Sequence, residues 1–153
     1  MNTATSDDLI LKIERLIRAP RERVFDAFTK PEEMSKWMAP EGMTIPEASM
    51  ELRVGGKFRA VMQEKNGTQH IVLGTYTEVD RPSRLVHTHC WVMDNGKGND
   101  TTPETIVTID FIDENGATRI KFSQTGFMTK ESRDAHEFGW SSSFDNLLKV
   151  LNT

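Results

Sequence analysis

Cysteine, long hydrophobic runs and clusters of positive charge are all scarce in this chain of 153 residues. Cys90 is the single cysteine, which excludes an internal disulfide framework and favours a reducing compartment. The longest unbroken hydrophobic run covers residues 90–93, whereas a helix that crosses a bilayer needs about 20 such residues. Residues 1–8 have neither the basic segment nor the hydrophobic core of a secretory signal, so we expect a flexible tail there. These absences predict a cytoplasmic protein that does not insert into a membrane.

Charge is mixed and slightly negative. The 19 Lys and Arg residues stand against 23 Asp and Glu residues, which gives a net charge of −4 at pH 7. Affinity for nucleic acid rests on clustered basic residues, and here they are scattered, so we expect no nucleic-acid partner. A hydrophobic content of 37% and a charged content of 27% are typical of a folded globular chain. The length predicts a single domain over residues 1–153.

The usual motifs of cofactor and metal sites are missing as well. The sequence has no glycine-rich phosphate loop, no G-x-S-x-G turn, and neither the H-E-x-x-H nor the C-x-x-C spacing. His87 and His89 leave the same face of a predicted strand and could begin a metal site. A zinc ion, however, needs three or four protein ligands, and Cys90 points to the other face. We therefore predict no cofactor and no metal site.

The strongest periodic signal lies in residues 129–151, at the C-terminal end. Its hydrophobic side chains recur at the spacing of one helical face: Trp140, Phe144, Leu147, Leu148 and Leu151. No other segment is long enough and periodic enough to form a long helix. This stretch is therefore the element on which the rest of the chain must pack.

Most of the preceding chain alternates with a period of two. Residues 9–17 predict a half-buried strand, and Pro20 and Pro31 then predict the starts of two short helices, which end near residues 30 and 38. Six further strands follow, separated by turn residues, at residues 43–53, 57–63, 70–79, 84–93, 104–112 and 118–124. Gly55 and Gly56 predict a tight hairpin with positive φ angles, and residues 94–102 predict an exposed hairpin loop. The predicted fold is α+β: a curved antiparallel sheet of about seven strands, in the order β-α-α-β6-α, wrapped around the C-terminal helix.

Several local motifs carry a family resemblance. They are Arg18, Ala19, Pro20, Val24, Phe25, Phe28, Pro31 and Trp37 near the start; Arg53, Gly55, Gly56, Phe58, Gly74, Tyr76, Pro82, Arg84, Leu85 and Thr88 in the middle; and His136, Gly139, Trp140 and Leu147 near the end. In this combination the chain resembles the START-like or Bet v I-like superfamily, also called the helix-grip fold. More closely, it resembles the bacterial homologues of the heat-shock-protein ATPase activator. The resemblance implies a cavity between sheet and helix, which in the superfamily holds lipids, sterols, polyketides or plant hormones.

We predict that side chains from the inner faces of the strands and from the C-terminal helix line such a cavity. The predicted lining residues are Trp37, Met38, Phe58, Met62, Tyr76, His89, Trp91, Phe122, Gln124, His136, Gly139, Trp140 and Phe144. A glycine in mid-helix costs about 1 kcal/mol relative to alanine, so Gly139 answers a steric need. Two explanations remain open at this point. Gly139 either leaves room for a ligand beside a wall formed by Trp140, or it allows the helix to pack closely on the sheet with Trp140 in the core.

Three functions fit these observations. The first is binding of a small hydrophobic or amphipathic molecule in the cavity. The second is a cofactor-independent enzyme of the cyclase or dehydratase type, in which His89 or His136 moves protons. The third is stimulation of a chaperone ATPase, as the family name implies; it is the least favoured, because no second domain is present to hold a partner. An exposed edge strand could also pair with a second copy of the chain to form a homodimer.

Overall fold

The computed structural model describes residues 9–93 and 100–152. The predicted tail at residues 1–8 and most of the predicted loop at residues 94–102 therefore lie outside the described residues. The elements follow in the order β1 (Leu11–Ile17), α1 (Arg21–Thr29), α2 (Pro31–Met34), β2 (Met43–Met50), β3 (Lys57–Glu64), β4 (Gln69–Asp80), β5 (Arg84–Trp91), β6 (Thr105–Glu114), β7 (Ala117–Thr125) and α3 (Lys130–Leu151). The predicted order of one strand, two short helices, six strands and a long helix is confirmed.

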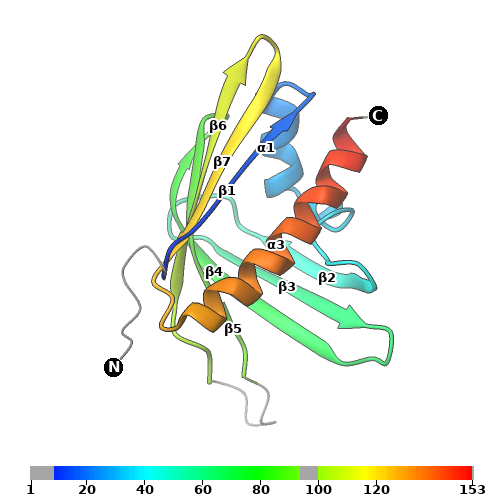
Figure 1. The fold of residues 1–153 in the computed structure, drawn as a ribbon, viewed down its shortest axis with the longest axis vertical. Helices are drawn as coiled ribbons and strands as arrows, with labels where there is room; N and C mark the ends of the chain where they lie inside the picture. The colour runs from blue at the N-terminus through cyan, green and yellow to red at the C-terminus, as the bar shows by residue number, and fades with distance from the viewer. Residues whose placement is uncertain (1–8, 94–99, 153) are drawn as a thin grey trace.

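The seven strands form one antiparallel sheet in the order β1-β7-β6-β5-β4-β3-β2. Strands β2 to β7 pair with their neighbours in the chain, as sequential hairpins do. The first strand joins the free side of β7, where Ile13 is opposite Phe122. The sheet curves strongly, and α3 lies across its concave side (Figure 1). The predicted helix-grip architecture is therefore confirmed, with β1 and β2 as the two edges.

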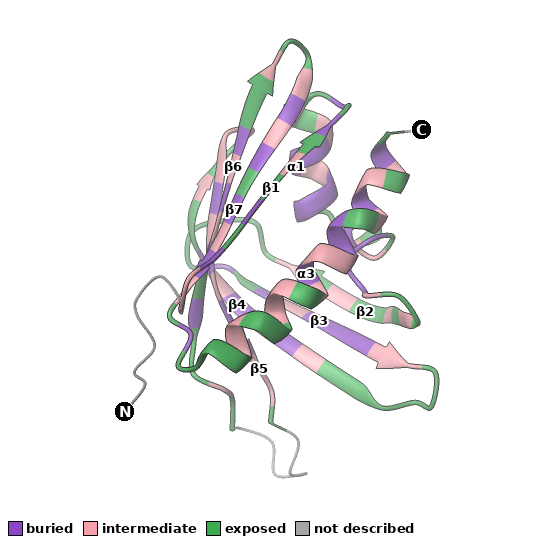
Figure 2. Ribbon diagram, in the orientation of Figure 1, coloured by how far each residue is buried: buried purple, intermediate pink, exposed green. Residues whose placement is uncertain are grey.

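Helix α3 has two halves that differ in burial. Thr129 caps its start, since the Thr129 side chain accepts a hydrogen bond from the backbone N–H of Ser132. None of the residues 130–139 is buried, whereas the second half contributes Trp140, Ser143, Phe144, Leu147 and Leu151 to the interior. Figure 2 shows this change from exposed to buried along the helix. The second half anchors α3 in the core, and the first half is left free to border an open space.

The second short helix is shorter than predicted. It ends at Met34 instead of continuing to residue 38, so Trp37 and Met38 lie in the turns that follow it. Trp37 is nonetheless buried, and its indole N–H donates a hydrogen bond of 2.9 Å to the carbonyl oxygen of Ala27 in α1. This bond fixes the turn against α1 without a further helical turn. The periodic reading failed here because buried side chains in a tight turn can mimic a helical stripe.

The Gly55-Gly56 turn also differs from the prediction in its detail. Gly55 has a φ of +83°, as expected, but Gly56 does not adopt a positive φ. A Cβ atom at Gly56 would overlap the carbonyl oxygen of Glu51. The second glycine is thus required by the close approach of two backbone segments. The turn is wider than a two-residue hairpin, because β2 already ends at Met50.

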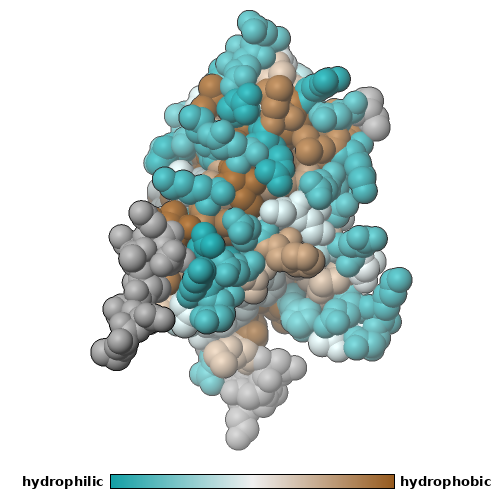
Figure 3. Space-filling model, viewed as in Figure 1, coloured by the Kyte–Doolittle hydropathy of each residue, from teal (hydrophilic) through white to brown (hydrophobic). Residues whose placement is uncertain are grey.

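Hydrophobic side chains on the visible face gather between β1 and the last turns of α3, whereas hydrophilic ones cover the tips of the β3–β4 hairpin (Figure 3). Among the described residues, no helix has the length and hydrophobicity needed to cross a membrane.

Candidate functional site

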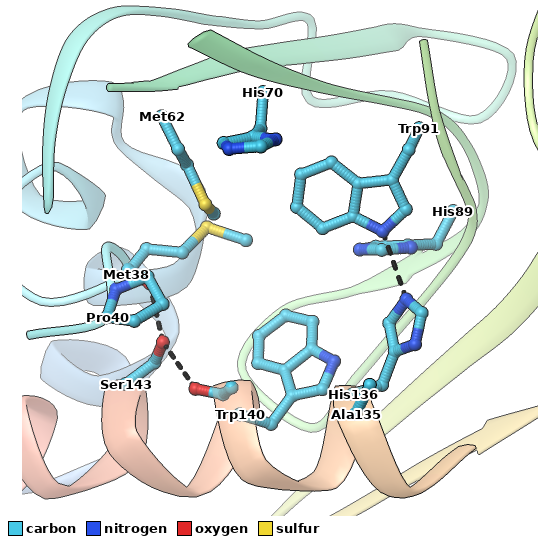
Figure 4. A pocket seen from close by; sticks show the side chains of 11 residues that line it. Met38, Pro40, Met62, His70, His89, Trp91, Ala135, His136, Trp140 and Ser143 are labelled. Atoms are coloured by element: carbon cyan, nitrogen blue, oxygen red, sulfur yellow. Dashed lines mark hydrogen bonds between the residues drawn. The ribbon is translucent and has the colours of Figure 1, made fainter. Parts of the chain in front are cut away.

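A pocket of about 460 Å³ lies beneath the first half of α3. Its lining residues come from the turns after α2, from β3, β4 and β5, and from α3: Met38, Pro40, Met62, His70, His89, Trp91, Ala135, His136, Gly139, Trp140 and Ser143. In Figure 4, Met38 and Met62 line one end of the pocket, and Trp91, His89 and His136 line the other. The volume is within the range of pockets that hold small molecules.

Seven of the predicted lining residues meet at this pocket: Met38, Met62, His89, Trp91, His136, Gly139 and Trp140. Trp37, Phe58 and Tyr76 instead surround a much smaller cavity of about 20 Å³. Phe122, Gln124 and Phe144 line neither cavity. The rings of Phe122 and Phe144 pack against Trp140 at centroid distances of 4.7 and 5.6 Å, so these two residues support the pocket wall from behind.

Four lining residues were not among those predicted: Pro40, His70, Ala135 and Ser143. His70 could have been found from the alternation, because it shares the inward face of β4 with Val72, Gly74 and Tyr76. Ala135 precedes Gly139 by four residues, which is one helical turn. Pro40 follows a turn and left no periodic signal.

Gly139 borders open space. A Cβ atom built on it would have no atom within 4 Å outside its immediate neighbours, so no close helix-to-sheet contact requires a glycine there. Of the two explanations, close packing at Gly139 is therefore wrong. Gly139 opens onto the pocket, as the other explanation requires, and Trp140 both forms a pocket wall and reaches the core, with 7% of its surface exposed.

A chain of buried hydrogen bonds supports this wall. The indole N–H of Trp140 donates to Oε1 of Gln124 at 2.9 Å, and the amide of Gln124 donates to Oγ1 of Thr105 at 2.8 Å. A longer contact of 3.4 Å joins the Gln124 amide nitrogen to Nδ1 of His89. The hydroxyl of Thr105 in turn donates to the backbone oxygen of His89 at 3.1 Å. The chain connects α3 to β7, β6 and β5 through side chains that are all nearly inaccessible to water.

His89 is the deepest polar residue of the pocket, with 2% of its surface exposed. Burial, and secondarily the proximity of His87 and His136, hold the pKa of His89 well below its ordinary value. The imidazole is therefore neutral near pH 7. In this state it can donate one hydrogen bond and accept another.

His136 connects α3 to β5. Its Nδ1 lies 2.7 Å from the backbone oxygen of Ser132, and its Nε2 lies 3.0 Å from the indole nitrogen of Trp91. The carbonyl oxygen can only accept and the indole N–H can only donate. His136 therefore carries its proton on Nδ1 and accepts from Trp91 at Nε2. Both ring nitrogens are occupied, as the dashed line in Figure 4 shows for the bond to Trp91.

A third cavity, of about 200 Å³, lies on the other side of this connection. It shares His89, Trp91 and His136 with the main pocket and extends toward Phe127 and Met128. The Trp91–His136 hydrogen bond thus forms part of a wall between two spaces. The ring of Phe127, 4.9 Å from that of His136, supports this wall from the smaller side.

His87 lies apart from His89, although the two share a face of β5. Its ring packs 4.7 Å from that of Phe58 and borders the small cavity, and its Nδ1 lies 2.8 Å from the backbone oxygen of Thr88. Burial lowers the pKa of His87 to about 4. Within residues 9–93 and 100–152, no group of three His, Cys, Asp or Glu side chains is arranged to hold a metal ion.

An antiparallel sheet that encloses a long helix, with a pocket between the two, defines a START-like domain. The sequence profile of the family described as "Activator of Hsp90 ATPase homolog 1-like protein" matches residues 18–152, and the chain belongs to this family. The comparison with curated proteins gives no match.

Solved structures of several bacterial proteins share the fold over almost the whole length of the chain. A protein of Nitrosomonas europaea is 26% identical with a TM-score of 0.78, and 95% of each chain is covered. The AHSA1 protein of Silicibacter pomeroyi is 26% identical with a TM-score of 0.82, and 94% of this chain and 97% of that chain are covered. A protein of Chromobacterium violaceum is 24% identical with a TM-score of 0.82, and 94% of this chain and 98% of that chain are covered. At this identity the likeness concerns the fold alone. These likenesses support the fold, and they name no ligand.

Proposed function

We propose that this protein binds a small, mainly apolar molecule in the pocket beneath the first half of α3. The observation that carries this proposal is the open space in front of Gly139, in a pocket of about 460 Å³. A mid-helix glycine without a packing role is costly to stability, and here it leaves free the space that a larger side chain would take from a ligand. We propose the cytoplasm as the site of action, on the strength of the single cysteine.

The lining supports an apolar ligand. Both indole N–H groups at the pocket are already bound, Trp91 to His136 and Trp140 to Gln124. The tryptophans therefore offer their ring surfaces and no free donor. Met38 and Met62 add flexible thioether side chains, which adapt to the shape of a bound molecule.

Proton-transfer catalysis has weaker support, although His89 and His136 do meet at the pocket, with ring centroids 5.8 Å apart. Both nitrogens of His136 are engaged in hydrogen bonds, so it has no free lone pair with which to act as a base. His89 is held neutral by burial, which makes it a poor base as well. Binding without chemistry requires neither histidine to change protonation.

Mass spectrometry under native conditions, on protein purified without denaturant, is the direct test for a resident molecule. A panel of fatty acids, sterols and polycyclic aromatics then tests binding through the melting temperature. A ligand at a hundredfold excess over its Kd adds about 2.7 kcal/mol to stability, which corresponds to a rise in Tm of about 5–10 °C for a domain of this size. The Gly139→Leu variant places a bulky side chain in the pocket and should weaken this response, whereas Gly139→Ala adds only one methyl group and should keep it. Absence of both a bound molecule and any Tm response, or an equal response in Gly139→Leu, would contradict the proposal.

The family description names activation of the Hsp90 ATPase, and this function has its own test. Purified protein is added in equimolar amount to an Hsp90 chaperone, and the rate of ATP hydrolysis is measured. Under our proposal the rate stays unchanged. An increase that survives in Gly139→Leu would assign the function to a surface of the domain instead of its pocket.

A further inference from the structure

The imidazole of His89 has one ring nitrogen in the buried hydrogen-bond chain and one outside it. Nδ1 contacts the amide of Gln124, while Nε2 has no hydrogen-bond partner in the part of the chain that the structure describes. Figure 4 shows the ring nearly edge-on, with its far nitrogen directed toward the open middle of the pocket. A polar atom of a side chain that is 2% exposed thus faces the space where a ligand would lie.

The directions of the hydrogen bonds in this chain determine whether Nε2 of His89 carries a proton. The indole of Trp140 can only donate, so the atom of Gln124 that receives this bond is the amide oxygen, and the other atom is the NH₂ group. This NH₂ group faces Thr105 and Nδ1 of His89, and it can only donate to them. Nδ1 must therefore be the acceptor. In a neutral imidazole the proton then resides on Nε2, which points into the pocket as an N–H donor.

The alternative forms of His89 conflict with the same contacts. A proton on Nδ1 would face the NH₂ group of Gln124, donor against donor, in either the other neutral tautomer or the cation. The cation is further disfavoured by burial and by the neighbouring His87 and His136, which lower the pKa of His89. Two features, the direction of the hydrogen bonds and the burial of the side chain, thus lead to the same neutral donor.

We propose that the ligand is an uncharged apolar molecule with a hydrogen-bond-accepting oxygen, such as a carbonyl, and that this oxygen binds the Nε2–H of His89. This inference rests on the proposed function, since it describes the ligand of that same pocket. An unpaired donor at the bottom of an apolar pocket selects strongly, because a ligand without an acceptor leaves it unsatisfied. The described residues that line the pocket include no lysine or arginine that could pair with an anionic ligand.

Three rigid molecules of nearly the same shape test the inference. 9-Fluorenone carries an acceptor oxygen, fluorene carries no polar group, and carbazole carries an N–H donor. Their dissociation constants are measured by isothermal titration with the full-length protein. We expect 9-fluorenone to bind about three- to tenfold more tightly than fluorene, the factor of one hydrogen bond, and carbazole to bind no more tightly than fluorene.

The His89→Phe variant is the matched control, because phenylalanine keeps a flat ring and removes the donor. In this variant 9-fluorenone and fluorene should bind equally. Equal affinities in the unmodified protein, a preference for carbazole, or a preference for 9-fluorenone that persists in His89→Phe would overturn the inference while leaving a binding pocket. Failure of all three molecules to bind would overturn this inference, whereas the proposed function is decided by the resident molecule and by the response to the wider panel.

A second measurement needs neither a variant nor a ligand. In protein labelled with ¹⁵N at histidine, the nitrogen resonances of His89 should show a protonated Nε2 and an unprotonated Nδ1 at about pH 7. A proton on Nδ1 would contradict the assignment of the donor, whatever the binding experiments show.

Discussion

Gly139 and Gly74 both lie on inner surfaces of the fold, but their surroundings are opposite. A Cβ atom at Gly139 would enter open space, whereas one at Gly74 would overlap the ring of Phe58 and the backbone oxygen of Thr88. At Gly74 the missing side chain makes room for another side chain of the same protein. At Gly139 it leaves a space that no part of the described chain fills.

Alanine at these two positions should therefore change stability in opposite directions. Gly139→Ala should raise the free energy of unfolding by about 1 kcal/mol, since alanine favours the helix and meets no atom. Gly74→Ala should lower it by about 1–3 kcal/mol through overpacking. Urea unfolding of both variants measures the changes. Destabilisation by Gly139→Ala would mean that the helix needs the glycine for packing.

Substitution of Trp140 should disturb the buried hydrogen-bond chain most. In Trp140→Phe the oxygen of Gln124 loses its donor while it remains buried, which should cost about 1–3 kcal/mol beyond the smaller ring. Phe138→Leu, at a residue of α3 that is 80% exposed, is the control and should change stability by less than about 0.5 kcal/mol. Equal effects of the two substitutions in urea unfolding would show that the hydrogen-bond chain contributes nothing.

At the scale of single residues, alternation in the sequence predicts which side chains face inward, and the inward positions of His89, Trp91 and Met62 follow from it. It does not predict which inward residues meet at one cavity. Trp37 and Tyr76 also point inward, yet they border the small cavity of about 20 Å³. The proton position on His89 depends on Gln124, which is 35 residues away in the chain. Such properties arise from contacts between strands and are absent from any local pattern.

At the scale of elements, the two halves of α3 have different roles. The mixed set of small, bulky and polar residues before Phe144 borders the pocket, and the leucines after it pack into the core. The short helix α2 was less predictable. Its four residues form only one turn, and what holds the following segment in place is the hydrogen bond from Trp37 to α1.

The bond between Trp91 and His136 should couple β5 to α3 measurably. A double-mutant cycle of Trp91→Phe and His136→Leu should give a coupling free energy of about 0.5–1.5 kcal/mol in urea unfolding. Trp37→Phe combined with His136→Leu is the control, since the indole of Trp37 donates to Ala27 instead. In that control pair, the two changes in the free energy of unfolding should add within about 0.5 kcal/mol. Additivity in both cycles would mean that the wall between the two cavities is not held by this bond.

At the scale of the whole molecule, the fold was predictable because its signals are redundant. Seven alternating stretches, turn residues between them and one long helical face all lead to a sheet around a helix. The size of the pocket was not predictable. It depends on how far the first half of α3 lies from β3, β4 and β5, and this separation results from the packing of the other half.

The stability of the folded state should fall in mild acid. Burial lowers the pKa of His87 to about 4, while an unfolded histidine titrates near 6.5. Between these two values the unfolded chain binds a proton that the folded chain does not. The contribution of neutral His87 to the free energy of unfolding is therefore fully present above about pH 6.5 and decreases as the pH falls. Below about pH 4 this group causes no further loss. Through His87 alone, the free energy of unfolding should decrease by about 2 kcal/mol between pH 7 and pH 5, and His89 should lower it further.

Urea unfolding at several pH values, with the protein and its His87→Phe variant side by side, checks this expectation. The variant removes the titrating group and keeps a ring against Phe58, so its stability should decline less by about 2 kcal/mol over the same range. Identical pH dependence of the two proteins would show that folding does not lower the pKa of His87.

The central claim is that a ligand binds between β5 and α3, and the three tryptophans of the chain allow a direct measurement. Trp91 and Trp140 line the pocket, whereas the indole of Trp37 is buried against Ala27. The indole N–H signals in a ¹H–¹⁵N NMR spectrum are recorded while 9-fluorenone is added. A ligand in the pocket should shift the signals of Trp91 and Trp140 and leave that of Trp37 in place. Signals that all remain unmoved at saturating 9-fluorenone, or a shift confined to Trp37, would contradict the claim.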